Sequence, residues 1–240
     1  MEPVVEVEDL WKFFGELAAL RGISFKVNVG EVYGLIGPNG AGKTTCFRIL
    51  ATILRPGRGC AKVLGVDVGQ DPQRVRRMIS YLPEDAGVYR SLRGVDYIRF
   101  LAGIYNREED EAIEEAEEIS GLGKALYDRM GTYSFGMRRR ILLAGALVAH
   151  PKLAILDEPT SGLDVTHAVY VRNMIKKYSR QGMTFLISSH NMLEVEYLCD
   201  RISFIDRGEI IAEGEPRSLM ENSGAKNLEE LFLSIRRGGD

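Results

Sequence analysis

The residues with the clearest chemical meaning form a glycine-rich run at 37–45, with the sequence Gly-Pro-Asn-Gly-Ala-Gly-Lys-Thr-Thr. An apolar run precedes it at 32–36 and a run with helical spacing follows at 46–50, so we predict a strand, a turn and a helix. Glycines allow the backbone to point its N–H groups inward, and a helix start adds N–H donors and the positive end of its dipole. Loops of this kind bind phosphate groups. The run therefore predicts a site for a nucleoside triphosphate.

The side chains of this loop have distinct expected roles. Lys43 is expected to bring a positive charge to the β- and γ-phosphates, both in binding and in catalysis. The hydroxyl of Thr44 is expected to be a ligand of Mg²⁺. The other expected nucleotide contacts are Gly37, Pro38, Asn39, Gly40, Ala41, Gly42 and Thr45. The alternative is a glycine-rich turn without this function, but a chance match in a chain of this length is on the order of one in a hundred.

Polar side chains also follow three other predicted strands. They are Asp157 and Glu158 after residues 153–156, His190 after residues 184–189, and Glu84 after residues 79–83. In open parallel sheets, ligands bind beyond the carboxyl ends of the strands. If these strands are parallel neighbours of the strand at 32–36, the polar groups meet the phosphate loop at one site.

Each of these polar groups has an expected role and a simpler alternative. Asp157 would hold Mg²⁺ through a water molecule, and Glu158 would orient the attacking water or accept its proton. His190 would contact the γ-phosphate, and Glu84 would lie near the metal. The alternatives are a helix cap for the acidic pair, a structural role for the histidine and a turn position for Glu84.

The predicted elements place these groups on a β–α scaffold. Strands are predicted at 4–10, 23–29, 32–36, 60–64, 79–82, 153–156, 184–188, 202–205 and 209–212. Helices are predicted from the N-cap Asp71 with Pro72 to about Met78, almost throughout 91–145, from Asp164 and from Asn191. Asp164 is a candidate N-cap of its helix. Because the β–α alternation stops at 91 and returns after Pro151, we predict a parallel-sheet core with a helical insertion.

Composition excludes several classes of protein. The 240 residues are 45% apolar and 27% charged, as in ordinary globular proteins, and the net charge of −3 gives no electrostatic case for nucleic acid. No apolar run approaches the roughly 18 residues of a membrane span, and the N-terminus lacks the pattern of a signal peptide. The three scattered cysteines suggest neither a disulfide framework nor a zinc site. A cytoplasmic compartment is therefore expected.

Taken in order, these motifs resemble those of the ATP-binding cassette (ABC) family, the ATPase subunits of ABC transporters. The resemblance covers nearly the whole chain. Its motifs are Walker A at 37–45, Walker B at 153–158, a D-loop at 161–164, a switch histidine at His190, an aromatic loop at 12–15 and a signature at 133–137.

The resemblance implies a fold, a substrate and partners. The fold would be α/β, a P-loop NTPase core with a mainly parallel sheet, an N-terminal antiparallel β subdomain and an inserted helical subdomain. Residues 1–240 would form one domain, with the helical subdomain at about 85–150 and a helical tail at about 215–240. Phe14 would stack on adenine, although a core or surface aromatic is an alternative.

The family also implies an assembly on the cytoplasmic face of the cell membrane. Two cassettes, in a homodimer or a heterodimer, would close over two ATP molecules and Mg²⁺, each ATP lying between Walker A of one subunit and Ser134 and Gly136 of the other. Closure would drive integral membrane permease subunits, because ATP stabilises the state in which it contacts both halves. The helical insertion and the loop around Glu84 would contact the membrane partner.

Two motifs, the signature and the Q-loop, depart from the family pattern. Phe135 replaces the first glycine of the signature pair, and Met137 replaces its glutamine. A phenylalanine near a phosphate must point away, or closure is impaired. Glu84 occupies the position of the Q-loop glutamine and adds negative charge near the phosphates. The segment Tyr81-Leu-Pro-Glu84 and the short tail are most similar to the drug- and lipid-export branch.

The sequence also predicts the packing of the C-terminal tail and the position of Cys46. Leu228, Leu231, Phe232 and Ile235 form an apolar stripe with helical spacing, which favours packing on the domain. Cys46 lies one turn after Lys43, and we favour a buried core position over a thiol that faces the nucleotide.

Alternative functions remain within the same family. A soluble ABC ATPase that remodels ribosomes or DNA complexes would usually have two cassettes in one chain or long coiled coils, and this chain has neither. A weakly hydrolysing half of a heterodimer is supported only by Phe135. The sequence does not identify the transported substrate.

Overall fold

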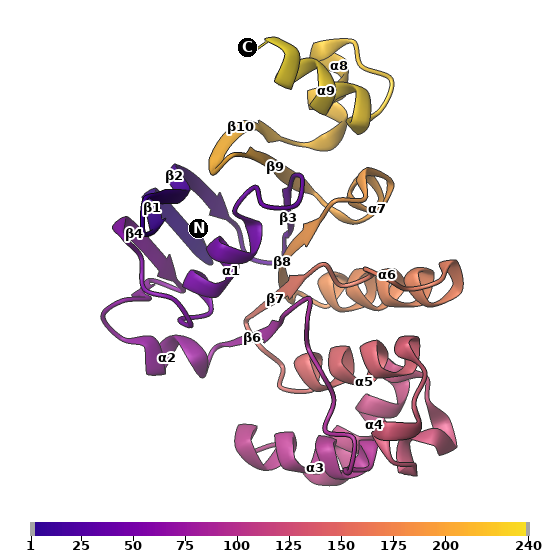
Figure 1. The fold of residues 1–240 in the computed structure, drawn as a ribbon. Helices are drawn as coiled ribbons and strands as arrows, with labels where there is room; N and C mark the ends of the chain where they lie inside the picture. Colours follow the sequence, from indigo (N-terminus) through magenta and orange to yellow (C-terminus); the bar gives the residue numbers. More distant parts are fainter. Residues whose placement is uncertain (1–2, 239–240) are drawn as a thin grey trace.

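Two β-sheets organise the chain, which the computed structural model describes for residues 3–238 (Figure 1). The larger sheet has the strand order β10-β9-β3-β8-β7-β6. Its strands are β3 (Val32–Ile36), β6 (Ile79–Leu82), β7 (Leu153–Asp157), β8 (Thr184–Ser189), β9 (Arg201–Asp206) and β10 (Glu209–Gly214). All neighbours pair in parallel except the edge strand β10, which is antiparallel to β9. The mainly parallel sheet predicted from the sequence is confirmed.

The smaller sheet is antiparallel and has the order β2-β1-β4-β5. It consists of β1 (Val5–Phe14), β2 (Leu17–Val27), β4 (Arg58–Val63) and β5 (Val66–Asp67). β1 and β2 form a long hairpin. The strand predicted at 4–10 ends four residues before β1 does, and the strand predicted at 23–29 begins six residues after β2 does and runs two residues past its end. Register shifts in the β1–β2 pairing interrupt the two-residue alternation of apolar side chains, which hides the strand ends from a pattern search.

Helices cover the larger sheet and form the insertion. They are α1 (Lys43–Leu50), α2 (Pro72–Arg76), α3 (Gly94–Tyr105), α4 (Glu109–Ser120), α5 (Phe135–Leu147), α6 (Val165–Arg180), α7 (Met192–Leu198), α8 (Pro216–Ser223) and α9 (Leu228–Gly238). The caps predicted at Asp71 and Asp164 are confirmed, because each side chain accepts a hydrogen bond from its helix start. Asn191, where a helix was predicted to begin, also caps it. The nearly continuous helical span predicted at 91–145 is broken after α3 and α4 by left-handed residues, Asn106 and Gly121.

The parallel strands separate two apolar cores. Leu153 and Ile155 of β7 face the core beneath α1 and the smaller sheet, whereas Ala154 and Leu156 face the core on the other side. In Figure 1, α1 and the smaller sheet lie on one side of the parallel strands, and α6 and α7 lie on the other. Strands buried on both faces are apolar at most positions, which explains the nearly continuous apolar runs of the sequence.

The tail packs on the domain, as predicted. Leu228, Leu231 and Phe232 are buried, and Ile235 packs against the same core. The ring of Phe232 lies 5.4 Å from that of Phe204 on β9, measured between centroids. Among the helices at residues 3–238, none is both long enough and apolar enough to span a membrane.

Candidate active site

The order of the parallel strands brings the predicted polar groups to one edge of the sheet. β3, β8, β7 and β6 are consecutive neighbours, as the expected convergence requires. Their carboxyl ends lead into the glycine-rich loop, His190, the Asp157-Glu158 pair and Glu84 respectively. A pocket of about 380 Å³ opens there, and its lining includes residues 38–45 with Phe14, Glu84 and Glu158.

Two glycines of the loop are required by close backbone contacts. A Cβ atom on Gly37 would lie 2.0 Å from the carbonyl oxygen of Ile205 on β9. Gly42 has a φ of +113°, and a Cβ atom there would lie 2.7 Å from the carbonyl oxygen of Ala19. Both positions therefore exclude larger residues, which keeps the start of α1 against the two sheets.

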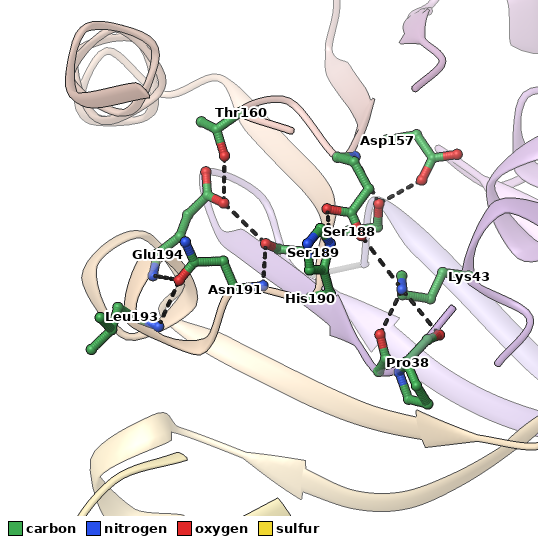
Figure 2. A network of polar contacts seen from close by, with 12 residues as sticks. Pro38, Lys43, Asp157, Thr160, Ser188, Ser189, His190, Asn191, Leu193 and Glu194 are labelled. Carbon is green, nitrogen blue, oxygen red and sulfur yellow. Dashed lines mark hydrogen bonds and ion pairs between the residues drawn. The ribbon is translucent and has the colours of Figure 1, made fainter. Parts of the chain in front are cut away.

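Lys43 lies at the base of the pocket and is only 6% exposed. Its Nζ donates hydrogen bonds to the carbonyl oxygens of Gly37, at 2.6 Å, and Pro38, at 3.3 Å. Nζ also lies 3.5 Å from Oε1 of Glu158. The ammonium group thus stands between the loop backbone and the acidic end of β7 (Figure 2). This position places a buried positive charge beside the glycine-rich loop.

Ser188 of β8 organises the two acidic residues. Its hydroxyl donates to Oδ1 of Asp157 at 2.5 Å and accepts from the N–H of Glu158 at 2.9 Å. The second carboxylate oxygen of Asp157, Oδ2, is buried without a hydrogen-bond partner. A buried orphan carboxylate oxygen fits a metal ion or a metal-bound water. The described residues contain no group of three or more His, Cys, Asp or Glu side chains that could hold a metal by themselves, so hydroxyl, water and phosphate oxygens would complete the shell.

Glu158 adopts a backbone conformation that is uncommon for its residue type. Its φ is +49°, in the left-handed region. A non-glycine residue there carries strain of order 1–3 kcal/mol, which persists only when the surroundings fix it. The carboxylate is 4% exposed, and its Oε2 lies 2.9 Å from Nδ1 of His190. The strained turn therefore directs this carboxylate into the pocket between His190 and Lys43.

A further buried carboxylate, Glu194 of α7, connects the ends of β7 and β8. Its Oε2 accepts hydrogen bonds from Thr160 at 2.6 Å and from Ser189 at 3.0 Å (Figure 2). Burial raises the pKa of Glu194, and the two hydroxyl donors lower it by a smaller amount. Thr160 precedes the D-loop and Ser189 precedes His190, so this side chain holds the two segments together.

Phe14 and Glu84 both line the pocket. In the sequence, Phe14 precedes the phosphate loop and Glu84 follows it. The ring of Phe14 is 49% exposed, and Nζ of Lys12 lies 5.4 Å from its centroid. An exposed ring at the rim of a nucleotide pocket is available for stacking on a base. Both residues are placed where the motifs predict, and their roles stay predictions.

The signature residues lie at the start of α5, and none of them lines the pocket around Lys43. Ser134 caps this helix, because its Oγ accepts from the N–H of Met137 at 3.2 Å. The ring of Phe135 is 58% exposed and borders Gly162, where a Cβ atom would lie 3.0 Å from it. Phe135 therefore rests beside the D-loop of its own chain, whereas Gly136 is buried, and a Cβ atom there would lie 2.9 Å from the ring of His167.

Comparisons with known proteins agree with this geometry. A family model described as ABC transporter matches residues 20–161. The daunorubicin/doxorubicin resistance ATP-binding protein DrrA of Streptomyces peucetius is 39% identical over 93% of this chain and 69% of its own length. The chain belongs to the ABC transporter family. It is the ATP-binding type of subunit, an ATPase, and the family predicted from the motifs is confirmed.

Other members support this placement of the ABC subunit. The linearmycin resistance ATP-binding protein LnrL of Bacillus subtilis is 34% identical over 96% of this chain and 75% of that protein. A solved structure described as the ATP binding subunit of an ABC transporter is 27% identical, with a TM-score of 0.88, and covers 97% of this chain and 99% of its own. The α/β fold is thus that of the ABC ATPases.

Three residues of the ABC subunit's site were not identified from the sequence. They are Ser188, Glu194 and Arg139. Ser188 and Arg139 donate to Asp157 at the end of β7, and Glu194 accepts from the hydroxyl of Ser189 at the end of β8. Arg139 carried a signal, because Gly136, Arg139 and Leu143 recur at helical spacing on the buried face of α5. A charged residue on such a stripe indicates a polar partner inside the protein.

Cys46 lies in the core of the ABC subunit, with no exposed surface, and it does not line the pocket. Burial raises the pKa of its thiol, which lowers its reactivity further. We expect a thiol reagent to leave Cys46 of the native protein unmodified with or without ATP, while the partly exposed Cys60 reacts. Peptide mapping by mass spectrometry measures this, and ATP-sensitive labelling of Cys46 would contradict the core position.

Proposed function

We propose that this chain powers export through membrane permease subunits, by closing with a second cassette over ATP and hydrolysing it. The contact of Lys43 and His190 with the two carboxylate oxygens of Glu158, beside the orphan oxygen of Asp157, carries the hydrolytic part of the proposal. The proposal of export rests on the relatives, two of which are named for resistance to linearmycin and to daunorubicin and doxorubicin.

ATP would bind at the carboxyl ends of the parallel strands. Lys43 and the loop N–H groups would hold the β- and γ-phosphates, and Phe14 would stack on the adenine ring. The remaining proposed contacts are Gly37, Pro38, Asn39, Gly40, Ala41, Gly42, Thr44 and Thr45. Mg²⁺, held by the Thr44 hydroxyl, Asp157 and Glu84, would neutralise part of the phosphate charge.

Hydrolysis requires a water molecule aligned with the γ-phosphate. Glu158 is proposed to orient this water and to accept its proton, because its carboxylate is fixed in the pocket and faces the loop. His190 would hold that carboxylate through Nδ1 and present its other ring nitrogen toward the γ-phosphate. Ser134 and Gly136 of a second cassette would supply N–H donors from the start of α5 on the opposite side.

Contact with the membrane partner would involve the helical segment. We propose one domain over 1–240, with a helical subdomain at about 85–150 and a tail at about 215–240. A pocket of about 430 Å³ separates the strand β6 and its following loop from α3 and α5. Its lining includes apolar and aromatic residues, among them Leu82, Pro83, Tyr97, Leu101 and Leu142. This groove, close to Glu84, supports docking of a cytoplasmic helix of a permease subunit at the inner face of the membrane.

The deciding experiment is a tagged pull-down from gently solubilised native membranes, with the co-purified proteins identified by mass spectrometry. We expect a polytopic membrane protein, together with this cassette alone or a second one. Ribosomal or DNA-associated proteins without a membrane protein would instead support a remodelling ATPase. A second pull-down tests the groove itself, with a chain that carries Tyr97→Arg and Leu101→Arg. This variant should lose the membrane partner if the groove is the docking site.

A further inference from the structure

Arg139 of α5 makes a set of contacts that the proposed reaction does not yet use. Its side chain is buried, with 4% exposure. The guanidinium donates only to backbone oxygens, and these belong to the two segments that carry Glu84 and Glu158. The acceptors are the carbonyl oxygens of Pro159 at 3.0 Å, Pro83 at 2.9 Å, Glu84 at 3.4 Å, Asp157 at 2.8 Å and Glu158 at 2.9 Å.

Burying the charge of Arg139 costs free energy, so a contribution to stability does not by itself explain its position. Burial lowers the pKa of Arg139, and the nearby carboxylates of Asp157, Glu84 and Glu158 offset only part of that effect. A buried charge can often be replaced by a well-packed apolar residue without loss of stability. The planar fork of donors, however, can bind several carbonyl groups in a fixed arrangement, which no apolar residue and no lysine reproduces.

The contacts fix the backbone at the position where it is strained. The N–H of Glu158 donates to Ser188, and its carbonyl oxygen accepts from Arg139. The left-handed turn that directs the Glu158 carboxylate is thus held from both sides. Without the guanidinium, the carbonyl group of Asp157 loses this buried donor, and that of Glu158 keeps only the N–H of Ser161, at 3.1 Å.

The same side chain connects this turn to the signature. Arg139 lies in the second turn of α5, which Ser134 caps and whose first residues are Phe135 and Gly136. Because a helix of this length is stiff, a shift of its N-terminus moves the guanidinium and the carbonyl groups that it binds. Signature residues that meet the nucleotide of a second cassette are therefore linked mechanically to the chain's own Glu158.

We propose that Arg139 is a positioning residue for hydrolysis, which fixes the turn of Glu158 and the loop of Glu84 relative to the signature helix. This inference rests on the proposed function, because it assigns Arg139 a role in the turnover step that Glu158 carries. Arg139 does not line the phosphate pocket, so nucleotide binding and turnover should separate when it is changed.

The test compares Arg139→Met with Arg140→Met in the full chain. Arg140 lies on the same helix and donates to the carbonyl oxygens of Ser120, the last residue of α4, and of Gly121, which follows it, away from the pocket. We expect Arg139→Met to lower kcat at least about tenfold while the Kd for ADP changes less than about threefold. Arg140→Met should keep kcat within about twofold, and Arg139→Lys should restore part of the loss.

Each outcome has a clear meaning. An Arg139→Met chain with the kcat of the Arg140→Met chain overturns the inference, and so does a parallel loss of kcat and ADP affinity, which indicates a purely structural role. If Arg139→Met does not fold, Arg139→Lys decides by the same measurement, and an unchanged kcat overturns the inference. Full turnover in Glu158→Gln would defeat the proposed hydrolytic role of Glu158 itself. Loss of turnover in Glu158→Gln with normal turnover in Arg139→Met would defeat only the inference on Arg139.

Discussion

Replacing Glu158 with glutamine is expected to lower the rate of ATP hydrolysis by about 10²- to 10⁴-fold, the range for loss of a general base. The amide has the size of the carboxylate and can keep the contact with His190 through its oxygen. It cannot accept a proton from water. Because Lys43 retains its hydrogen bonds to the loop carbonyl groups, nucleotide affinity should change by less than about threefold.

Phosphate release measures the first effect, and calorimetric titration with ATP measures the second. A suitable control is Glu117→Gln, which removes the same charge from an exposed position on α4. The control should hydrolyse ATP at the original rate. Hydrolysis by Glu158→Gln at a rate close to that of the control would remove Glu158 from its proposed role.

The phosphate loop and the convergence of the site could be predicted because both depend on local sequence. A glycine-rich run between a strand and a helix has few other uses, and polar residues after buried strands are visible as breaks in apolar runs. Parallel neighbours then place those breaks at one edge of the sheet. The caps at Asp71 and Asp164 were predictable for the same reason, since their partners lie three residues along the chain.

The contacts that hold the site in place could not be predicted in this way. Arg139 binds carbonyl groups 18 to 56 residues away in the sequence, and Glu194 binds a hydroxyl 34 residues away. Side-chain periodicity describes only the helix or strand to which a residue belongs, so it indicates that Arg139 is buried and not what it binds. The left-handed turn at Glu158 is similarly a product of tertiary contacts, because glutamate has no intrinsic preference for it.

Replacing Lys43 with alanine is expected to weaken ATP binding by about 10- to 100-fold, which corresponds to the roughly 1.5–3 kcal/mol of a hydrogen bond to a charged group. The ammonium is buried and close to both the loop and Glu158, so its loss removes a phosphate partner and leaves the Glu158 carboxylate to repel the phosphates. The two effects have the same sign. Titration with a non-hydrolysable ATP analogue keeps the Glu158 carboxylate in place and avoids turnover of the ligand.

A matched control for this change is Lys152→Ala, an exposed lysine just before the start of β7 and therefore at the opposite edge of the sheet. The Lys152→Ala change removes one positive charge, as Lys43→Ala does, so any effect of net charge on the binding of an anion appears in both variants. The difference between the two dissociation constants then isolates the local contribution of the pocket. Equal affinities in Lys43→Ala and Lys152→Ala would contradict a phosphate-binding role for the loop, because a buried ammonium in contact with phosphate cannot be lost without cost.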